Sequence, residues 1–145
     1  GAEDGNRCEG QWEEEGDRVL IGFCILGGIF SEGIDLKRDS LIGAIIVGTG
    51  LPQISNEKAI LRAYFDSCEV DGFDYAFRYP GMNKVLQAAG RVIRTAEDIG
   101  IVVLLDERFG SPACRRRFPR EWDDCLTVSV DRIGKRIERF WDEWL

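Results

Sequence analysis

Histidine is absent from this chain of 145 residues. Without it, the chain can build neither a Ser-His-Asp triad nor a histidine-ligated zinc site. Its five cysteines include no Cys-x-x-Cys pair, which argues against a closed zinc or iron–sulfur site. An odd number of irregularly spaced cysteines also argues against a disulfide framework and is typical of a reducing compartment. We therefore expect no metal site within this chain.

A long hydrophobic run and a phosphate-binding loop are absent as well. The longest apolar run is too short to span a bilayer, and no signal peptide precedes it. These absences predict a cytoplasmic protein with no membrane partner. The pattern Gly-x-x-x-x-Gly-Lys-Ser/Thr, whose backbone amides cradle nucleotide phosphates, occurs nowhere in the chain. The chain therefore cannot hold a nucleotide in the manner of a P-loop.

The residues that are present suffice for one globular domain. Apolar residues make up 44% of the chain, which is enough to fill a core. The formal net charge is -7, so any contact with nucleic acid must come from local basic clusters. Much of the negative charge precedes residue 18. We expect residues 1–18 to form an acidic, loosely ordered leader and residues 19–145 to form the domain.

Hydrophobic patterning predicts an α/β fold. Three apolar runs are typical of strands buried in a parallel sheet, and they cover residues 19–26, 41–47 and 101–105. Three stretches have the apolar spacing of helices, and they cover residues 56–68, 82–98 and 131–145. Residues 125–130 could add an edge strand, and we expect the aromatic residues of the last helix to pack onto the sheet. Ligands of such a layered, mainly parallel sheet bind beyond the carboxyl ends of its strands.

The octet at residues 87–94, Gln-Ala-Ala-Gly-Arg-Val-Ile-Arg, carries the clearest chemical signal. On a helix, Gln87, Arg91 and Arg94 lie at i, i+4 and i+7 and point from one face. Two guanidinium groups and an amide on one stripe suit phosphate oxygens, because arginine donates hydrogen bonds from a planar fork. Gly90 has no Cβ, so a ligand or another backbone can come close.

A second candidate lies just after the first apolar run, in the loop at residues 28–36. Its glycines let the backbone approach a ligand, and Glu32 and Gly33 lie at its centre. Asp35 can accept hydrogen bonds from a ribose hydroxyl or fix an arginine. Lys37 and Arg38 follow directly and supply local positive charge.

These segments resemble motifs of superfamily 2 helicases. The octet is similar to Q-x-x-G-R-x-x-R, motif VI, and the loop is similar to G-x-F-x-E-G-I-D, motif V of DinG-like and XPD-like helicases. Three further segments also resemble the family pattern, in family order, and they are 79–84, 105–109 and 118–122. The chain thus resembles the second RecA-like domain of a DinG/XPD-type DNA helicase.

The resemblance implies a three-layer RecA-like fold of the P-loop NTPase type, partial and truncated at its N-terminal side. It implies that Arg91 and Arg94 are arginine fingers for the γ-phosphate of ATP, with Gln87 hydrogen-bonding nearby. The other implied site residues contact the nucleotide cleft or single-stranded DNA. Those at the cleft are Glu32, Gly33, Asp35 and Gly90, and those at the DNA are Lys37 and Arg38.

The resemblance also implies partners and cofactors. The first RecA-like domain of the same polypeptide is expected to make most of the contacts to ATP and Mg2+. Single-stranded DNA is the expected nucleic-acid partner. An iron–sulfur cluster could belong to that first domain but not to this chain. We therefore expect this chain alone not to hydrolyse ATP, and we expect a role in DNA repair or replication-linked unwinding.

Two alternatives and one further surface remain open. Residues 45–52 run from a predicted strand into Gly48-Thr49-Gly50, as in a Rossmann-type dinucleotide module, although Gln53 stands where that motif needs its third glycine. The chain could instead be a non-catalytic interaction domain that docks a partner through its last helix. The consecutive arginines at 115–117 are a further candidate contact for DNA.

Overall fold

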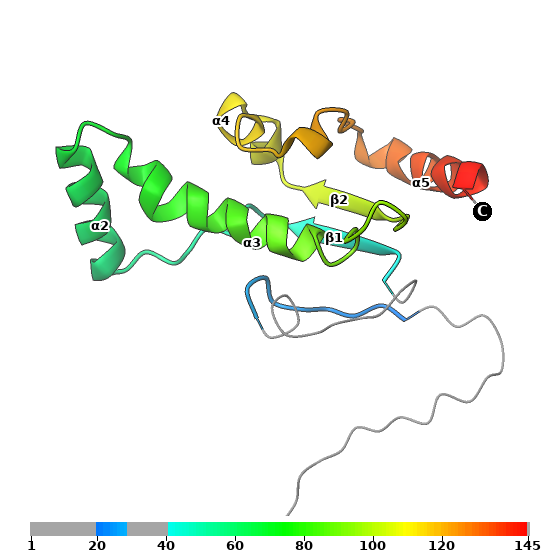
Figure 1. The fold of residues 1–145 in the computed structure, drawn as a ribbon, viewed down its shortest axis with the longest axis horizontal. Helices are drawn as coiled ribbons and strands as arrows, with labels where there is room; N and C mark the ends of the chain where they lie inside the picture. The colour runs from blue at the N-terminus through cyan, green and yellow to red at the C-terminus, as the bar shows by residue number, and fades with distance from the viewer. Residues whose placement is uncertain (1–19, 29–40, 145) are drawn as a thin grey trace, which may run out of the picture.

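The computed structural model describes residues 20–28 and 41–144. Its strands and helices alternate along the chain (Figure 1). In chain order they are β1 (Gly43–Val47), α2 (Asn56–Ser67), the π-helix η2 (Asp74–Arg78), α3 (Tyr79–Ala89), β2 (Ile101–Leu105), the 3-10 helix η3 (Glu107–Gly110), α4 (Pro112–Arg115), the 3-10 helix η4 (Arg120–Trp122) and α5 (Val130–Trp144). The expected α/β fold is confirmed.

The sheet consists of β1 and β2, which pair in parallel with Gly43 opposite Ile101 and Val47 opposite Leu105. Both strands coincide with apolar runs in the sequence, so these two expectations are confirmed. Side chains alternate between the faces of a strand. On β1, Ile46 is 5% exposed on the face that packs against α3, whereas Ile45 is 67% exposed on the opposite face.

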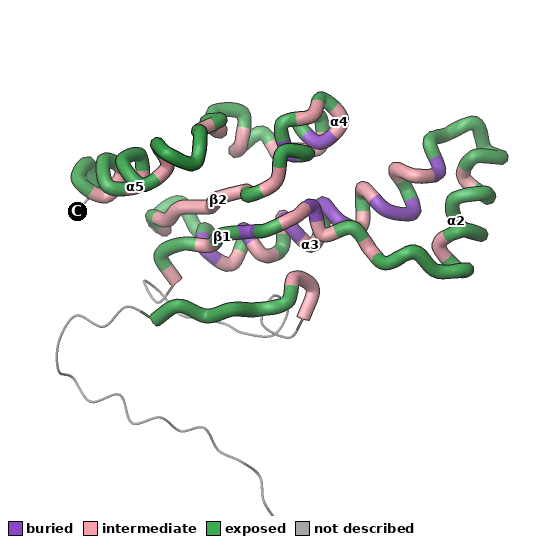
Figure 2. The backbone as a smooth tube through the Cα atoms, turned by 180° about the vertical axis from the view of Figure 1, so that it is seen from behind, coloured by how far each residue is buried: buried purple, intermediate pink, exposed green. Residues whose placement is uncertain are grey.

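The core lies between the sheet, α3 and the segment after β2 (Figure 2). Its buried members are Ile46, Met82, Val85, Ala89, Phe109 and Cys114. On α3 the core residues recur at helical spacing, and Pro80 stands in the first turn, where its missing N–H costs no hydrogen bond. Val85 is fully buried, and burial of such a side chain stabilises the fold by about 1.5–3 kcal/mol.

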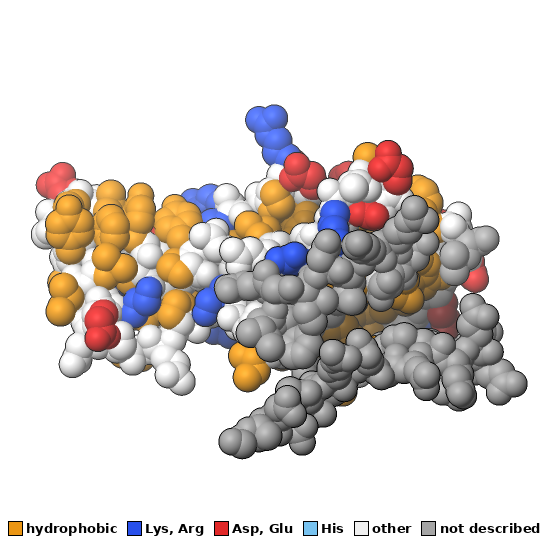
Figure 3. All heavy atoms as spheres, turned by 60° about the horizontal axis from the view of Figure 1, so that its bottom comes forward, with side chains coloured by type: hydrophobic (Ala, Val, Ile, Leu, Met, Phe, Trp, Pro, Cys, Tyr) orange, Lys and Arg blue, Asp and Glu red, His pale blue; other side chains and the backbone are white. Residues whose placement is uncertain are grey.

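Helix α2 begins where the sequence predicts, because the Ser55 side chain accepts a hydrogen bond from the Lys58 N–H and caps it. The helix has no buried residue and projects from the rest of the molecule (Figure 1). Its main attachment is aromatic: Phe65 stacks on Tyr75 of η2 with the ring centroids 4.3 Å apart. Hydrophobic side chains gather over this end of the surface (Figure 3).

Three expected elements differ in the structure. Residues 20–26 form no strand, and Phe23 and Ile25 are 96% and 84% exposed, because no described strand pairs with them. The helix expected at 82–98 ends at Ala89, and the possible edge strand at 125–130 is irregular. The last helix is confirmed as α5, but none of its residues is buried, so its aromatic side chains do not pack tightly onto the sheet.

Candidate functional site

The arginines of the octet lie in a loop that follows α3, and the expectation of one helical stripe is wrong. Gln87 is exposed in the last turn of α3, and the helix ends where Gly90 donates its N–H to Leu86 O over 2.8 Å. Two further turn bonds follow, after which the chain leaves helical geometry. Arg91 is half-buried and Arg94 is exposed. We call residues 90–98 the arginine loop.

The arginine loop is fixed to the body of the domain by Val92. This side chain is 5% exposed, and a Cβ on Gly100, just before β2, would stand 2.5 Å from its Cγ1. The space beside Gly90 is narrow, since a Cβ there would lie 3.2 Å from Leu86 O. The loop therefore begins from a well-packed base, while Arg94 reaches the surface.

Asp98 organises the outer part of the arginine loop. One carboxylate oxygen accepts hydrogen bonds from the backbone N–H groups of Arg94 and Thr95, each over 2.8 Å. The Arg94 bond, followed by the Thr95 bond, holds the pKa of Asp98 below its ordinary value of 3.8. Sequence reasoning missed this residue, although Thr95-x-x-Asp98 has the spacing of a capping box, in which an acidic side chain reaches back to the N–H three residues earlier.

Removal of the Asp98 carboxylate should loosen the arginine loop. In Asp98→Ala, amide hydrogen exchange at Arg94 and Thr95 should rise several-fold, because both N–H groups lose their acceptor. Because folding lowers the pKa of Asp98, its ionised carboxylate stabilises the fold at pH values above the ordinary Asp pKa. This stabilisation is lost as the pH falls through the pKa of Asp98 in the folded state. A carboxyl carbon NMR titration should therefore place the Asp98 midpoint below 3.8. Glu97→Ala is the matched control. Equal exchange at Arg94 and Thr95 in both variants would contradict the proposed role of the Asp98 carboxylate.

The residue just before the expected motif V loop lies against α3. Gly28 N–H donates to Ile25 O over 2.9 Å, and Gly27 has a φ of +83°, a conformation that favours glycine. A Cβ on Gly27 would lie 3.1 Å from side-chain carbons of Lys84 and 3.4 Å from its Nζ. Lys84 stands about one turn before Gln87 on the same helix. Sequence reasoning did not single out Lys84, because nothing in the sequence shows this approach.

The remaining residues of that loop cannot be compared with the structure. Glu32, Gly33, Asp35, Lys37 and Arg38 lie outside the described residues, as does the expected leader at 1–18. The structure therefore places Gly27, just before this loop, against Lys84 of α3, and it leaves the roles of these five residues as predictions.

The glycine-rich turn after β1 is a close packing point between backbones. Gly48 and Gly50 have φ values of +82° and +65°. A Cβ on Gly50 would stand 2.8 Å from Gly81 O, at the beginning of α3. The next helix, α2, starts only at Asn56. A dinucleotide motif needs the helix to open directly at the glycines, so this geometry contradicts the Rossmann-type alternative.

A buried polar group lies within this turn, and a half-buried carboxylate follows β2. Thr49, within this turn, is 6% exposed, and its hydroxyl has no hydrogen-bond partner among the residues that the structure describes. At the carboxyl end of β2, Asp106 receives hydrogen bonds from Arg108 Nε and from a terminal nitrogen of the same guanidinium over 2.8 and 2.6 Å. This pairing, led by the Arg108 side chain, lowers the pKa of Asp106 to about 2.

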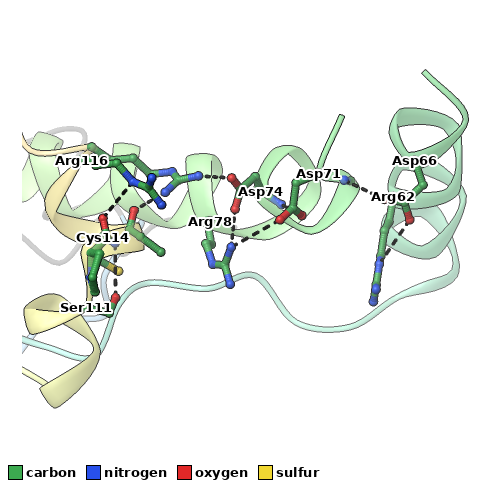
Figure 4. A network of polar contacts seen from close by, with 12 residues as sticks. Arg62, Asp66, Asp71, Asp74, Arg78, Ser111, Cys114 and Arg116 are labelled. Carbon is green, nitrogen blue, oxygen red and sulfur yellow. Dashed lines mark hydrogen bonds and ion pairs between the residues drawn. The ribbon is translucent and has the colours of Figure 1, made fainter. Parts of the chain in front are cut away.

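The consecutive arginines at 115–117 do not form one basic patch. Arg117 is only 12% exposed and donates to the carboxylate of Asp74, which also accepts a 2.5 Å bond from Arg78 (Figure 4). Arg115 donates to the Thr127 hydroxyl over 2.6 Å. Arg117 is thus a structural tie between the residues after α4 and the start of the η2–α3 helix, and this does not support a DNA contact at its side chain.

Within the described ranges, no helix is both long and apolar enough to cross a membrane. No group of three or more Cys, Asp or Glu side chains there is placed to hold a metal ion.

Comparison with known proteins gives consistent matches. Residues 2–125 match the family described as the helicase C-terminal domain. The chain is 30% identical over 140 residues to the regulator of telomere elongation helicase 1 homolog of Caenorhabditis elegans, which covers 90% of this chain and 14% of that protein. It is 40% identical over 83 residues to the ATP-dependent DNA helicase DinG of Photobacterium profundum, which covers 56% of this chain and 12% of that protein.

A third relative is the XPD helicase subunit of general transcription and DNA repair factor IIH from Schizosaccharomyces pombe, at 31% identity over 121 residues. That alignment covers 81% of this chain and 15% of the relative. The chain thus spans at most 15% of the length of each of these three proteins. Because the family match extends over most of its residues, the chain belongs to the helicase C-terminal domain family, in which DinG- and XPD-type helicases are its relatives.

Proposed function

We propose that this chain is the C-terminal motor domain of an ATP-dependent DNA helicase and that it completes the site of ATP hydrolysis on a neighbouring domain. One observation carries the proposal: the arginine loop leaves a helix that is packed into the core, and the turn at Gly27 lies against the same helix. The chain that leads into the motif V loop and the chain that leads into the arginine loop thus both rest on α3.

The arginines supply positive charge to the transferring phosphate. Negative charge on the leaving and transferring phosphoryl oxygens must be neutralised in the transition state. Arg91 and Arg94 each present a planar fork of donors that suits these oxygens, and Gln87 adds an amide in the last turn of α3. The exposure of Arg94 supports its role as the residue that reaches across a domain cleft.

The motif V loop links nucleotide to DNA in this proposal. Gly33 allows its backbone to approach the cleft, while Glu32 and Asp35 order the loop and contact the nucleotide or an arginine. Lys37 and Arg38 follow directly and contact phosphates of single-stranded DNA. Opening and closing of the cleft then moves the domain along the strand.

The rest of the motor belongs to a first RecA-like domain in the same polypeptide. This chain has no P-loop lysine pattern, so we place the main contacts to ATP and its Mg2+ on that first domain. Where an iron–sulfur cluster occurs, it belongs there too. The names of the relatives, which include DNA helicases and a DNA repair factor subunit, support this division of roles.

Reconstitution of the two-domain motor tests the proposed function. This chain alone should show no ATP turnover, whereas a polypeptide that joins it to the first RecA-like domain should hydrolyse ATP faster when single-stranded DNA is added. Asp35→Ala in that polypeptide should reduce the ratio of DNA-stimulated to unstimulated turnover. Asp131→Ala, at an exposed position in α5, is the control. Turnover by this chain alone, or unchanged stimulation in Asp35→Ala, would contradict the assignment.

A further inference from the structure

Residues 20–28 lead into the expected motif V loop and lie along one side of the molecule (blue in Figure 1). The first six of them, 20–25, are exposed, whereas 26–28 are half-buried. Leu26 packs against the hydrophobic core. The described part of this segment therefore meets the body of the domain through its last three residues.

This segment is received at two neighbouring points on α3. A Cβ on Gly50, in the turn after β1, would stand 2.9 Å from Cδ2 of Leu26 and 2.8 Å from Gly81 O at the beginning of the helix. About one turn further along α3, a Cβ on Gly27 would lie 3.1 Å from both Cδ and Cε of Lys84. Lys84 is therefore the helix side chain that lies directly beneath the backbone at Gly27.

The contact with Lys84 is made mainly by its methylene chain. Its Cδ and Cε lie closer to the position of a Cβ on Gly27 than its Nζ does, at 3.4 Å. A lysine often packs its methylene chain on a neighbouring surface while its ammonium group reaches water, and the half-burial of Lys84 fits this arrangement. Because Gly27 lacks a Cβ and has a φ of +83°, its backbone can lie close to that chain.

The same side of α3 leads to the residues proposed for ATP hydrolysis. Gly81, Lys84 and Gln87 recur at intervals of three residues, so they follow one side of the helix. Gln87 stands in the last turn, and the arginine loop leaves the helix directly after it, at Gly90. Lys84 thus touches the segment that enters the motif V loop and lies about one helical turn from Gln87.

We propose that Lys84 is a positioning residue, whose methylene chain supports the backbone at Gly27 and so sets the point from which the motif V loop starts. This role rests on the motor function proposed above. There, the contact carries the effect of DNA on the motif V loop to α3 and the arginine loop. Lys84 itself touches neither ATP nor DNA, so its loss changes the response of hydrolysis to DNA and leaves unstimulated hydrolysis in place.

Amide hydrogen exchange in this chain tests the contact without any motor activity. Gly28 N–H donates to Ile25 O, so exchange at this amide reports how firmly the turn is held. Lys84→Ala should raise the exchange rate of Gly28 by about fourfold, the effect of losing the burial of one methylene group. Lys84→Met keeps a long unbranched chain and should exchange like the parent. Lys135→Ala removes an exposed lysine from α5 and is the matched control.

ATP turnover in the two-domain polypeptide tests the positioning role. Lys84→Ala should lower the ratio of DNA-stimulated to unstimulated turnover by about fourfold, from the same loss of methylene burial. Unstimulated turnover and the KM for ATP should stay near those of the parent, and Lys84→Met should restore the ratio. Gly27→Ala disturbs the same contact from its other side, because a Cβ there crowds the Lys84 chain at a positive φ, and it should lower the ratio as well.

The outcomes separate this role from the proposed function. Equal exchange at Gly28 in the parent and in Lys84→Ala would overturn the contact. A Lys84→Met variant as impaired as Lys84→Ala would assign the effect to the ammonium charge and would also overturn the proposal. The same holds for stimulated and unstimulated turnover that fall equally in Lys84→Ala. A parent polypeptide without DNA stimulation would instead remove the proposed function and with it the coupling role, while exchange at Gly28 would still decide on the contact.

Discussion

Replacing Arg94 with alanine in the helicase that carries this domain should lower ATP turnover by about 10³-fold or more, the usual effect of losing an arginine finger. Arg94 is exposed at the tip of a loop whose base is held by Val92, so its guanidinium can meet a phosphate bound on another domain. ATP binding should change far less, since the phosphate contacts of the ground state belong mainly to that other domain. The measurement is steady-state hydrolysis together with nucleotide affinity.

Conservative and matched variants separate a catalytic role from a structural one. Arg94→Lys keeps the charge but loses the planar fork, so its turnover should lie between those of the parent and the alanine variant. Arg91→Ala, measured in parallel, identifies which arginine is the principal finger. Arg116→Ala removes another exposed arginine, bonded to the Pro112 carbonyl in α4, and should leave turnover near that of the parent. Full turnover in Arg94→Ala would remove this residue from the proposed mechanism.

Replacing Gly81 with alanine should lower the free energy of unfolding by about 2 kcal/mol. The new Cβ would stand 2.7 Å from Thr49 O and 3.2 Å from the carbonyl carbon of Gly50. Overpacking of this kind costs about 3 kcal/mol at its upper range. Alanine is about 1 kcal/mol more favourable than glycine inside a helix, which is less than the cost of the clash. The net change in the free energy of unfolding is therefore a loss of stability. The backbone of the turn cannot withdraw easily, because Gly48 and Gly50 already hold it in left-handed conformations.

Gly134→Ala is the matched control for this stability prediction. Gly134 also lies inside a helix, but a Cβ there meets no atom within 4 Å. Only the higher helix propensity of alanine then acts, so the free energy of unfolding of this variant should rise by up to about 1 kcal/mol. Urea unfolding of both variants measures the difference. Equal stability of Gly81→Ala and Gly134→Ala would contradict the tight packing of α3 against the turn after β1.

Local patterning predicted those parts of the fold that depend on neighbouring residues. The run at 101–105 became β2, and the helical spacing that begins at residue 56 became α2. Residues 20–26 look equally strand-like in sequence, but a strand forms only with a partner to take its backbone hydrogen bonds. In the same way, the spacing of apolar residues continues through Val92, whereas the helix ends at Ala89 because the turn at Gly90 and Val92 is fixed by packing against Gly100.

The sequence nominated the residue types of the candidate site but did not specify their geometry. The order of arginines and glycines in the sequence indicates Gln87, Arg91 and Arg94 as candidates, and their roles stay predictions. The backbone at Arg94 is held by the Asp98 carboxylate, and Gly27 lies against Lys84 of α3. Both features arise from tertiary contacts that residue spacing alone does not specify. The predictions for Glu32, Gly33 and Asp35 remain to be tested by mutation.

The ion pair between Arg117 and Asp74 limits how the η2–α3 helix can move within the domain. It fastens the start of the long η2–α3 rod to the chain after α4, while Val92 anchors the far end beside β2. A rod clamped at both ends cannot swing by itself. We therefore expect the base of the arginine loop to move with the rest of the domain, so that in the proposed mechanism a tilt of the whole domain would carry Arg94 toward or away from the phosphate.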